Sequence, residues 1–328
     1  MKKPKQDKKS VMLAPNTQVP FDDPSIDYTD GMFVSCKYDG NRCLVRGHQC
    51  LTRHMLIQAN TKLPVFLKEL CELSEKTGYY FDCELVLPKA EHHGDHTSIF
   101  NSHEKDIPKD TMVYVFDCIH KDQWAEKSPI PEFIDRYGKL TSLMRGLPER
   151  FKCVKQYLCF NPKTIEEIYK KYILVGQEGV MVRSTHGGYK FGRVGIKNSW
   201  LLKFKKQVTE DGKIINVLQK LKMKKGIVRT RDITGHRVQP TKNKENYTTT
   251  NSVGSFLVQT DDGKKSKIMF ASGVADEATK KKWWKDFKEN PKNFIGKYVE
   301  FVSYPGGKDG IRSGRMIRWR PDKDKNEK

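Results

Sequence analysis

The chain has 328 residues, of which 37% are hydrophobic, so its length and composition allow about two domains with packed cores. Lys and Arg outnumber Asp and Glu by 61 to 40, and the formal net charge is +21. Residues 206–328 carry +14 of this charge and residues 1–205 carry +7, which indicates a polyanionic partner such as nucleic acid. No long apolar run and no basic amphipathic helix favours a membrane surface as that partner.

The eight cysteines form no Cys-x-x-Cys pair, which disfavours a zinc ribbon. Most of them lie in apolar runs, where a free thiol behaves as a small buried hydrophobe. The basic N-terminus contains only Val11 to Leu13 as an apolar stretch, which is far too short for a signal peptide. We therefore expect a protein of a reducing, intracellular compartment.

In chain order, residues 1–30 are predicted to be a basic, flexible lead-in, and Phe33–Lys37 is predicted to be a strand. The strand is expected to turn at Asp39-Gly40 and to return along Cys43 to Val45 as a hairpin. The further elements expected before residue 206 are helices at 63–76, 131–144 and 164–174, strands at 79–87, 112–119, 179–183 and 201–205, and a polar, histidine-rich loop at 89–105. We assign no metal site to that loop, because dense histidine in a polar loop is more often incidental.

The composition changes after residue 206. Short strands are expected at 214–217, 254–260, 267–271 and 297–304, with a helix at 276–288 and a basic, partly looped stretch at 220–251. Short strands with one helix in about 120 residues are typical of a small β-barrel such as the OB-fold. The fold class is therefore predicted to be α+β, with a first domain at 31–206 built of antiparallel sheets and flanking helices, and a barrel domain at 207–328.

The hexapeptide Lys37-Tyr38-Asp39-Gly40-Asn41-Arg42 is the first candidate for chemistry. A lysine amine attacks phosphorus only when it is deprotonated, and its unperturbed pKa is about 10.4. A position at a strand end among other cations favours the neutral amine and presents it to a phosphate. Taken alone, the pattern fits an ordinary hairpin with a solvated lysine equally well.

Other functional residue types follow in apolar surroundings. Lys203 and Lys205 alternate with Leu202 and Phe204, so both lysines are expected on one side of their strand. The remaining candidates are Glu84 within an apolar strand, Phe116 in Tyr-Val-Phe-Asp, Glu178 before Gly-Val-Met-Val-Arg, and Arg320-Pro321-Asp322-Lys323 near the C-terminus.

These segments, in this order, resemble the collinear motifs of the covalent nucleotidyltransferases, a superfamily of DNA ligases, RNA ligases and mRNA capping enzymes. The resemblance extends from about Phe33 to Lys323 and involves six motifs. Within the superfamily, the Gly254-Ser255 strand, the Gly273-x-x-Asp276-Glu277 helix start and Ile295-Gly296-Lys297 look like the second domain of ATP-dependent DNA ligases of the minimal viral or bacterial type. The resemblance implies a nucleotidyltransferase (adenylation) domain followed by an OB-fold domain.

The resemblance also implies a role for each matched residue. Lys37 would be the nucleophile that forms lysyl-AMP from ATP, and Lys203 and Lys205 would neutralise the α-phosphate as charge develops. The residues implied to bind the nucleotide or the 5′-phosphate are Arg42, Arg53, Glu84 (ribose), Phe116 (adenine stacking), Glu178, Arg320, Asp322 and Lys323 (pyrophosphate). Glu84 and Glu178 would also hold a divalent metal, Mg²⁺ or Mn²⁺.

The partner implied is nicked double-stranded DNA, bound by a monomer that clamps around it, and no membrane. The activity implied is the joining of a 3′-hydroxyl to a 5′-phosphate, as used in DNA replication, repair and recombination. The compartment implied is the cytoplasm of a bacterial or phage-infected host, or otherwise a nucleus or viral replication site.

Two departures keep alternatives open. Ser35 stands where DNA ligases usually have a carboxylate that reads the adenine amino group, and Cys83 replaces the glycine of an Asp-Gly-Glu motif. The first departure is compatible with a GTP-dependent mRNA capping guanylyltransferase. An RNA ligase and a non-catalytic DNA-binding protein are further alternatives, although the terminal Arg320 motif and the intact lysines, respectively, count against them.

Overall fold

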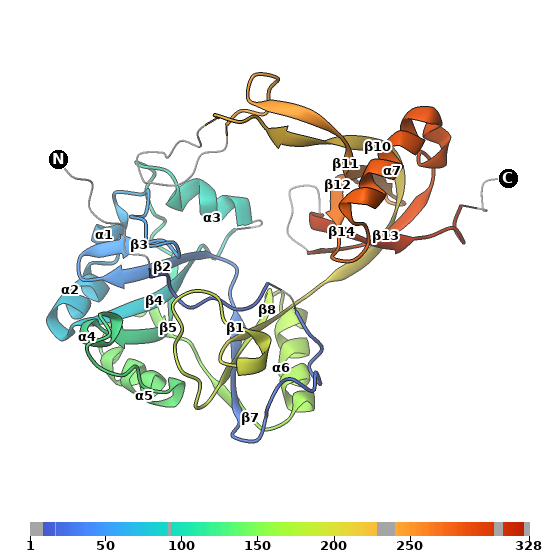
Figure 1. Ribbon diagram of the computed structural model, residues 1–328. Coiled ribbons are helices and arrows are strands. Elements are labelled where there is room, and N and C mark those ends of the chain that lie inside the picture. Colours follow the sequence, from blue (N-terminus) through green and yellow to red (C-terminus); the bar gives the residue numbers. More distant parts are fainter. Residues whose placement is uncertain (1–8, 17, 91–92, 228–239, 305–310, 325–328) are drawn as a thin grey trace. The chain divides into compact units, whose positions relative to one another are not determined.

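A computed structural model describes residues 9–16, 18–90, 93–227, 240–304 and 311–324, and Figure 1 shows their secondary structure. The chain divides into two compact units, 1–205 and 206–328. The division lies one residue before the predicted position. In the described residues, no helix combines the length and the apolar character that a membrane span needs.

The first unit contains a four-stranded antiparallel sheet in the order β7-β1-β8-β9. Its strands are β1 (Met32–Lys37), β7 (Tyr157–Cys159), β8 (Gly179–Ser184) and β9 (Leu202–Lys205). Alternate residues such as Val34, Val180 and Phe204 are buried and pack against helix α6 (Pro162–Leu174). This alternation turns the other residues of the central strands toward the opposite face.

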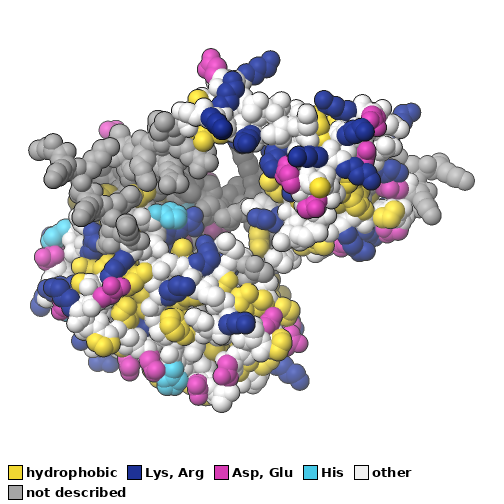
Figure 2. Space-filling model, viewed as in Figure 1, with side chains coloured by type: hydrophobic (Ala, Val, Ile, Leu, Met, Phe, Trp, Pro, Cys, Tyr) yellow, Lys and Arg dark blue, Asp and Glu magenta, His cyan; other side chains and the backbone are white. Residues whose placement is uncertain are grey.

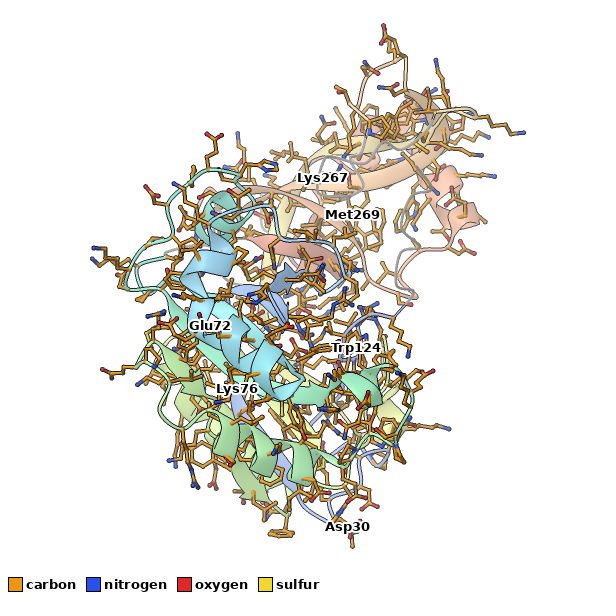
Figure 3. All side chains as sticks on the ribbon, turned by 90° about the vertical axis from the view of Figure 1, so that its left-hand side faces the viewer. Asp30, Glu72, Lys76, Trp124, Lys267 and Met269 are labelled. Carbon is orange, nitrogen blue, oxygen red and sulfur yellow. The ribbon has the colours of Figure 1, made fainter. Side chains whose placement is uncertain are left out.

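A second sheet of the same unit has the order β3-β2-β4-β5-β6, in which only β5 and β6 are parallel. Its strands are β2 (Asn41–Arg46), β3 (Gln49–Leu51), β4 (Tyr79–Val86), β5 (Met112–His120) and β6 (Phe151–Cys153). The remaining elements of the unit are α1 (Leu63–Phe66), α2 (Lys68–Thr77), α3 (His93–Phe100), α4 (Lys121–Trp124), α5 (Phe133–Leu143) and the 3-10 turn η1 (Ile196–Asn198). Helix α2 buries Leu70 and Cys71 against this sheet, and its polar face with Glu72 and Lys76 is directed outward (Figure 3).

The predicted hairpin at Asp39-Gly40 is wrong, because β1 and β2 belong to different sheets. Gly40 is needed for a close approach rather than for a hairpin turn. A Cβ atom at Gly40 would lie 2.4 Å from the carbonyl oxygen of Leu85 and 2.9 Å from Cγ of Glu84. The chain therefore crosses from one sheet to the other directly against the strand that carries Glu84.

Three other expectations need correction. The helix predicted at 63–76 is interrupted at Leu67, and its second part ends at Thr77, where Gly78 forms the C-cap with a left-handed φ of 73°. The polar loop predicted at 89–105 contains helix α3. The lead-in is not loose where it is described, because Val11 and Met12 are fully buried, whereas residues 1–8 lie outside the described residues.

The second unit is a closed five-stranded barrel in the order β10-β11-β12-β14-β13, which agrees with the predicted OB-like barrel. Its elements are β10 (Val208–Met223), β11 (Tyr247–Thr260), β12 (Lys265–Phe270), β13 (Tyr298–Tyr304), β14 (Arg312–Trp319), helix α7 (Glu277–Glu289) and the 3-10 turn η2 (Pro291–Asn293). Phe256, Ile268 and Phe301 are fully buried in the barrel, and Trp283 of α7 packs edge-on against Trp319. Strand β14 was not among the predicted strands.

Strands β10 and β11 continue past the barrel as a two-stranded ribbon (Figure 1). Their pairing extends to Met223 and Tyr247, so the two ends of the stretch predicted as partly looped at 220–251 are strand, whereas residues 224–227 and 240–246 lie outside strands. Residues 228–239 of that stretch lie outside the described residues.

Candidate active site

Three adjacent strands bring Lys37, Glu178 and Lys205 together. Lys37 ends β1, Gly179 begins β8, and Lys205 ends β9, and these three positions are register partners across the sheet. The carboxylate of Glu178, the residue before Gly179, forms ion pairs with the ammonium groups of both lysines. All three side chains are mostly but not completely buried, with 14–21% of each exposed. One carboxylate therefore holds two ammonium groups where the ends of these three strands meet.

Gly179 makes this convergence possible. Its φ is +149°, and a Cβ atom there would lie 1.9 Å from the carbonyl oxygen of Phe204. Only glycine lets β8 approach β9 so closely, which brings Glu178 within reach of Lys205.

Lys203 lies on the same side of β9 as Lys205, as the alternation predicted. Its cross-strand neighbour is Met181, whose other neighbour is Ser35. Burial, together with the positive charges of Lys205, Arg193 and Lys37, lowers the pKa of Lys203 to about 8, and the negative charge of Glu178 only partly opposes this shift. Lys203 therefore releases its proton more readily than an ordinary lysine does.

Glu84 reaches this region from β4 of the second sheet, where Arg42 of β2 is its cross-strand neighbour. The pKa of Glu84 is raised to about 7, chiefly by burial. The positive charges of Lys37 and Arg42 oppose this shift, and the negative charges of Glu178 and Asp82 add to it. The carboxylates of Glu84 and Glu178 thus repel each other near Lys37, and a bound cation would offset this repulsion. Mg²⁺ commonly binds through one or two carboxylates together with substrate phosphates and water, so Glu84 and Glu178 fit such an ion.

Phe116 lies at an irregularity in β5. The register moves there from the pair Asp82–Asp117 to the pair Cys83–Val115, which leaves Phe116 without a partner on β4. Such a bulge re-aims a side chain, and this one is half-buried. The guanidinium of Arg42 lies 5.3 Å from the ring centroid of Phe116.

Arg42 is anchored to a buried carboxylate. Its Nε and one terminal nitrogen donate to the two oxygens of Asp82 at 2.8 and 2.5 Å. Since a guanidinium has five N–H groups, donors remain for the phosphate contact that was predicted.

The remaining predicted residues are held by other partners. Arg53 is exposed, and its Nε contacts the imidazole of its neighbour His54 at 3.2 Å rather than joining the cluster. Arg320, Asp322 and Lys323 belong to the barrel unit, where Asp211 of β10 pairs with Arg320 and Lys323, and Arg320 also pairs with Asp322. One terminal nitrogen of Arg320 lies 2.9 and 3.0 Å from the Asp211 oxygens, and Lys323 Nζ lies 2.9 Å from Asp211.

Sequence reasoning did not single out several charged residues of these networks. Asp117, which is 1% exposed, accepts hydrogen bonds from the buried guanidinium groups of Arg136 and Arg183. Its position in the apolar run Val115–Ile119 was a usable signal, because a lone carboxylate there requires partners. Asp211 gave no comparable signal, since it stands beside Glu210 in a polar stretch.

Comparison with known proteins identifies the family to which this domain is similar. Residues 12–205 match the family of the ATP dependent DNA ligase domain. The chain belongs to this family. The match contains every site residue of the first unit, from Lys37 to Lys205, and the predicted family is thereby confirmed.

Two curated DNA ligases, from enterobacteria phages T4 and T6, are each 28% identical to the chain over 168 residues. The matched region is 50% of this chain and 28% of each phage ligase, so the chain corresponds to only part of their length.

Solved structures of DNA ligases share the fold of the whole chain. A Lig E DNA ligase, described as binding DNA with a minimal scaffold, has a TM-score of 0.66 at 21% identity, with 95% of this chain and 99% of that chain covered. A Chlorella virus DNA ligase-adenylate has a TM-score of 0.50 at 22% identity, with 96% and 99% covered. The α+β fold class predicted for this ligase-family chain is confirmed.

Proposed function

We propose that the protein is an ATP-dependent DNA ligase that seals nicks between a 3′-hydroxyl and a 5′-phosphate in duplex DNA. The observation that carries the proposal is the convergence of Lys37, Glu178 and Lys205 on three neighbouring strands of a family-matched domain. A nucleophilic amine, a carboxylate beside it and a second cation are the groups that nucleotidyl transfer to lysine requires.

In the first step, Nζ of Lys37 attacks the α-phosphorus of ATP. The N–P bond forms, the P–O bond to the β-phosphate breaks, and pyrophosphate leaves. The Glu178 carboxylate, already paired with Lys37, is placed to take the proton that the amine loses. Lys203 and Lys205 neutralise the charge that grows on the α-phosphate oxygens.

The two following steps use the same centre. A 5′-phosphate oxygen of the nicked strand attacks the AMP phosphorus, which breaks the N–P bond and frees Lys37. The 3′-hydroxyl then attacks the 5′-phosphate and releases AMP. Glu84 and Glu178 would hold Mg²⁺ or Mn²⁺, which supplies Lewis-acid stabilisation of phosphate charge. The roles of Phe116 in adenine stacking and of Arg42 and Arg53 in phosphate binding stay predictions.

The barrel unit supplies the terminal motif and much of the charge. Arg320, Asp322 and Lys323 would orient the pyrophosphate of ATP, and Asp211 holds the two cations of this motif side by side. Figure 2 shows Lys and Arg side chains spread over the visible face of this unit. The ribbon adds Lys220 and Lys222 within β10 and Lys224 directly after it. These cations suit contact with DNA phosphates by a monomeric enzyme that clamps the duplex.

All eight cysteines are free, as a reducing compartment would keep them. We therefore retain the proposal of an intracellular enzyme, in a bacterial or phage-infected cytoplasm or in a nucleus or viral replication site.

A strand-joining assay tests the proposed function. A labelled duplex with one nick is incubated with the protein, Mg²⁺ and either ATP or GTP, beside matched substrates that lack the 5′-phosphate or carry RNA at the nick. Joining of the 5′-phosphorylated DNA with ATP alone is expected. Capping-type transfer with GTP alone would assign the chain to the guanylyltransferase branch, with Ser35 as the residue that departed from the ligase pattern.

A further inference from the structure

A short N-terminal segment, residues 9–14, lies along the loop that leads to β9. Leu13 N–H donates to Gly192 O at 2.8 Å, and Val194 N–H donates to Leu13 O at 2.9 Å. Gly192 N–H donates to Ser10 O at 3.2 Å, and the Tyr189 hydroxyl accepts from Met12 N–H at 3.0 Å. We call residues 9–14 the N-terminal strap.

Buried side chains fix the strap to the first unit. Met12 and Ala14 pack in a cluster with Val194, Leu201 and Met181, and Met181 is the cross-strand neighbour of Lys203. The ammonium of Lys9 donates to the carbonyl oxygen of Trp124 at 2.7 Å. The strap therefore packs next to the strands that carry Lys203 and Lys205.

Further along the chain, the side chain of Gln18 forms hydrogen bonds with the main chain of Lys205 in β9. The main-chain N–H of Lys205 donates to Oε1 of Gln18 at 2.8 Å, and Nε2 of Gln18 donates to the Lys205 carbonyl at 3.3 Å. Strand β9 is an edge of its sheet, so these Lys205 groups face away from β8. The Gln18 amide completes the hydrogen bonding that a further strand would otherwise supply.

Lys205 has particular need of such support. It is the last residue of β9 and of the first unit, and the chain continues from it into the barrel unit. Movement of its main chain would displace the ammonium group that pairs with Glu178 beside Lys37. An unsupported strand end frays readily, because few hydrogen bonds must open to release it.

We propose that Gln18 is a positioning residue for Lys205: its side-chain amide locks the end of β9 so that the Lys205 ammonium stays at the reaction centre beside Glu178 and Lys37. The inference rests on the proposed function for its catalytic consequence, but its structural part does not.

The matching experiment compares Gln18→Ala, Gln18→Glu and wild type. Gln18→Ala is expected to slow single-turnover adduct formation at saturating ATP about ten- to hundred-fold, as a displaced catalytic group does. The ATP concentration for half-maximal rate should change much less, because the residues predicted to contact adenine and ribose, Phe116 and Glu84, belong to the other sheet. Gln18→Glu keeps an acceptor for the Lys205 N–H and should recover part of the rate. Gln123→Ala is the matched control, since Gln123 also accepts a hydrogen bond from a main-chain N–H, that of His120 at 3.0 Å, and should react like wild type.

Hydrogen exchange of the Lys205 amide, followed by NMR, is the second measurement. Gln18→Ala should speed exchange at Lys205 about ten-fold while the amides of β1 keep their protection. Unchanged exchange at Lys205, or an unchanged adenylation rate with faster exchange, would overturn the proposal. If wild type forms no adduct with ATP, the proposed function fails, whereas the exchange measurement still decides whether Gln18 holds this strand end.

Discussion

Replacing Asp117 with Asn should destabilise the first unit strongly, because Asp117 compensates two buried cations. Arg136 and Arg183 are 3% and 4% exposed, and they reach Asp117 at 2.9 and 2.5 Å. Burial would raise the pKa of Asp117, but these guanidinium groups outweigh it and lower the pKa. Removing the charged partner of a buried pair typically costs about 3–5 kcal/mol. At a urea slope of about 2 kcal/mol per M, the unfolding midpoint should fall by about 1.5–2.5 M.

The assay is hydrogen exchange of peptides from β5 and β8 in increasing urea, which isolates the first unit from the barrel. Asp106→Asn is the control, since Asp106 pairs with Lys62 at 2.5 Å but is 90% exposed, and its loss should leave the midpoint unchanged. The pH dependence has a defined sign. The stability due to Asp117 is fully present above its unfolded pKa of about 3.9 and is lost as pH falls through the lower folded value. A midpoint for Asp117→Asn equal to that of wild type would refute this account of the network.

Three further predictions concern the site. Because burial raises the pKa of Glu84 to about 7, unfolding releases a proton between about pH 4.3 and 7, so stability falls as pH rises through that range. Glu84→Gln should flatten this part of the curve of melting temperature against pH while reducing activity, and an unaltered curve would contradict the assignment. Gly179→Ala would place a Cβ 1.9 Å from Phe204 O, so β8 must part from β9 and the adduct yield should drop about 100-fold. Gly138→Ala is the control and should cause no drop, because Gly138 is an exposed residue of helix α5 with open space for a Cβ. Asp211→Asn should release Arg320 and Lys323 and slow adduct formation from ATP about ten-fold or more, yet leave the sealing of a pre-adenylated nick intact; equal slowing of both steps would show that Asp211 only stabilises the barrel.

Strand alternation made the lysine pair predictable. The period of two in Leu202–Lys205 placed Lys203 and Lys205 on one face, as the structure has them. The apolar flanks of Glu84 likewise indicated a functional carboxylate, and Glu84 lies close enough to Lys37 for their charges to interact. Local patterns sufficed in these cases because the face on which a side chain lies follows from its position within its own strand.

The rest depended on contacts that the sequence does not display. Asp39-Gly40 has the composition of a hairpin turn, but Gly40 is required by the approach to Leu85, which lies 45 residues further along the chain. Strand β14 gave no clear apolar alternation, because its exposed residues include Ile317 as well as Arg315 and Arg318, and among its residues of described burial only Gly314 and Met316 are buried. The bonds of Gln18 to Lys205 span 187 residues, so no local pattern indicated them.

The most direct test is to incubate the protein with Mg²⁺ and α-labelled ATP or, separately, α-labelled GTP, and to locate the covalent label by mass spectrometry of proteolytic peptides. The account predicts one AMP on the peptide that contains Lys37, no adduct with GTP, no adduct in Lys37→Ala, and loss of the label when nicked duplex DNA is added. Label on a different residue, or an adduct that persists in Lys37→Ala, would contradict the assignment of Lys37 as the nucleophile.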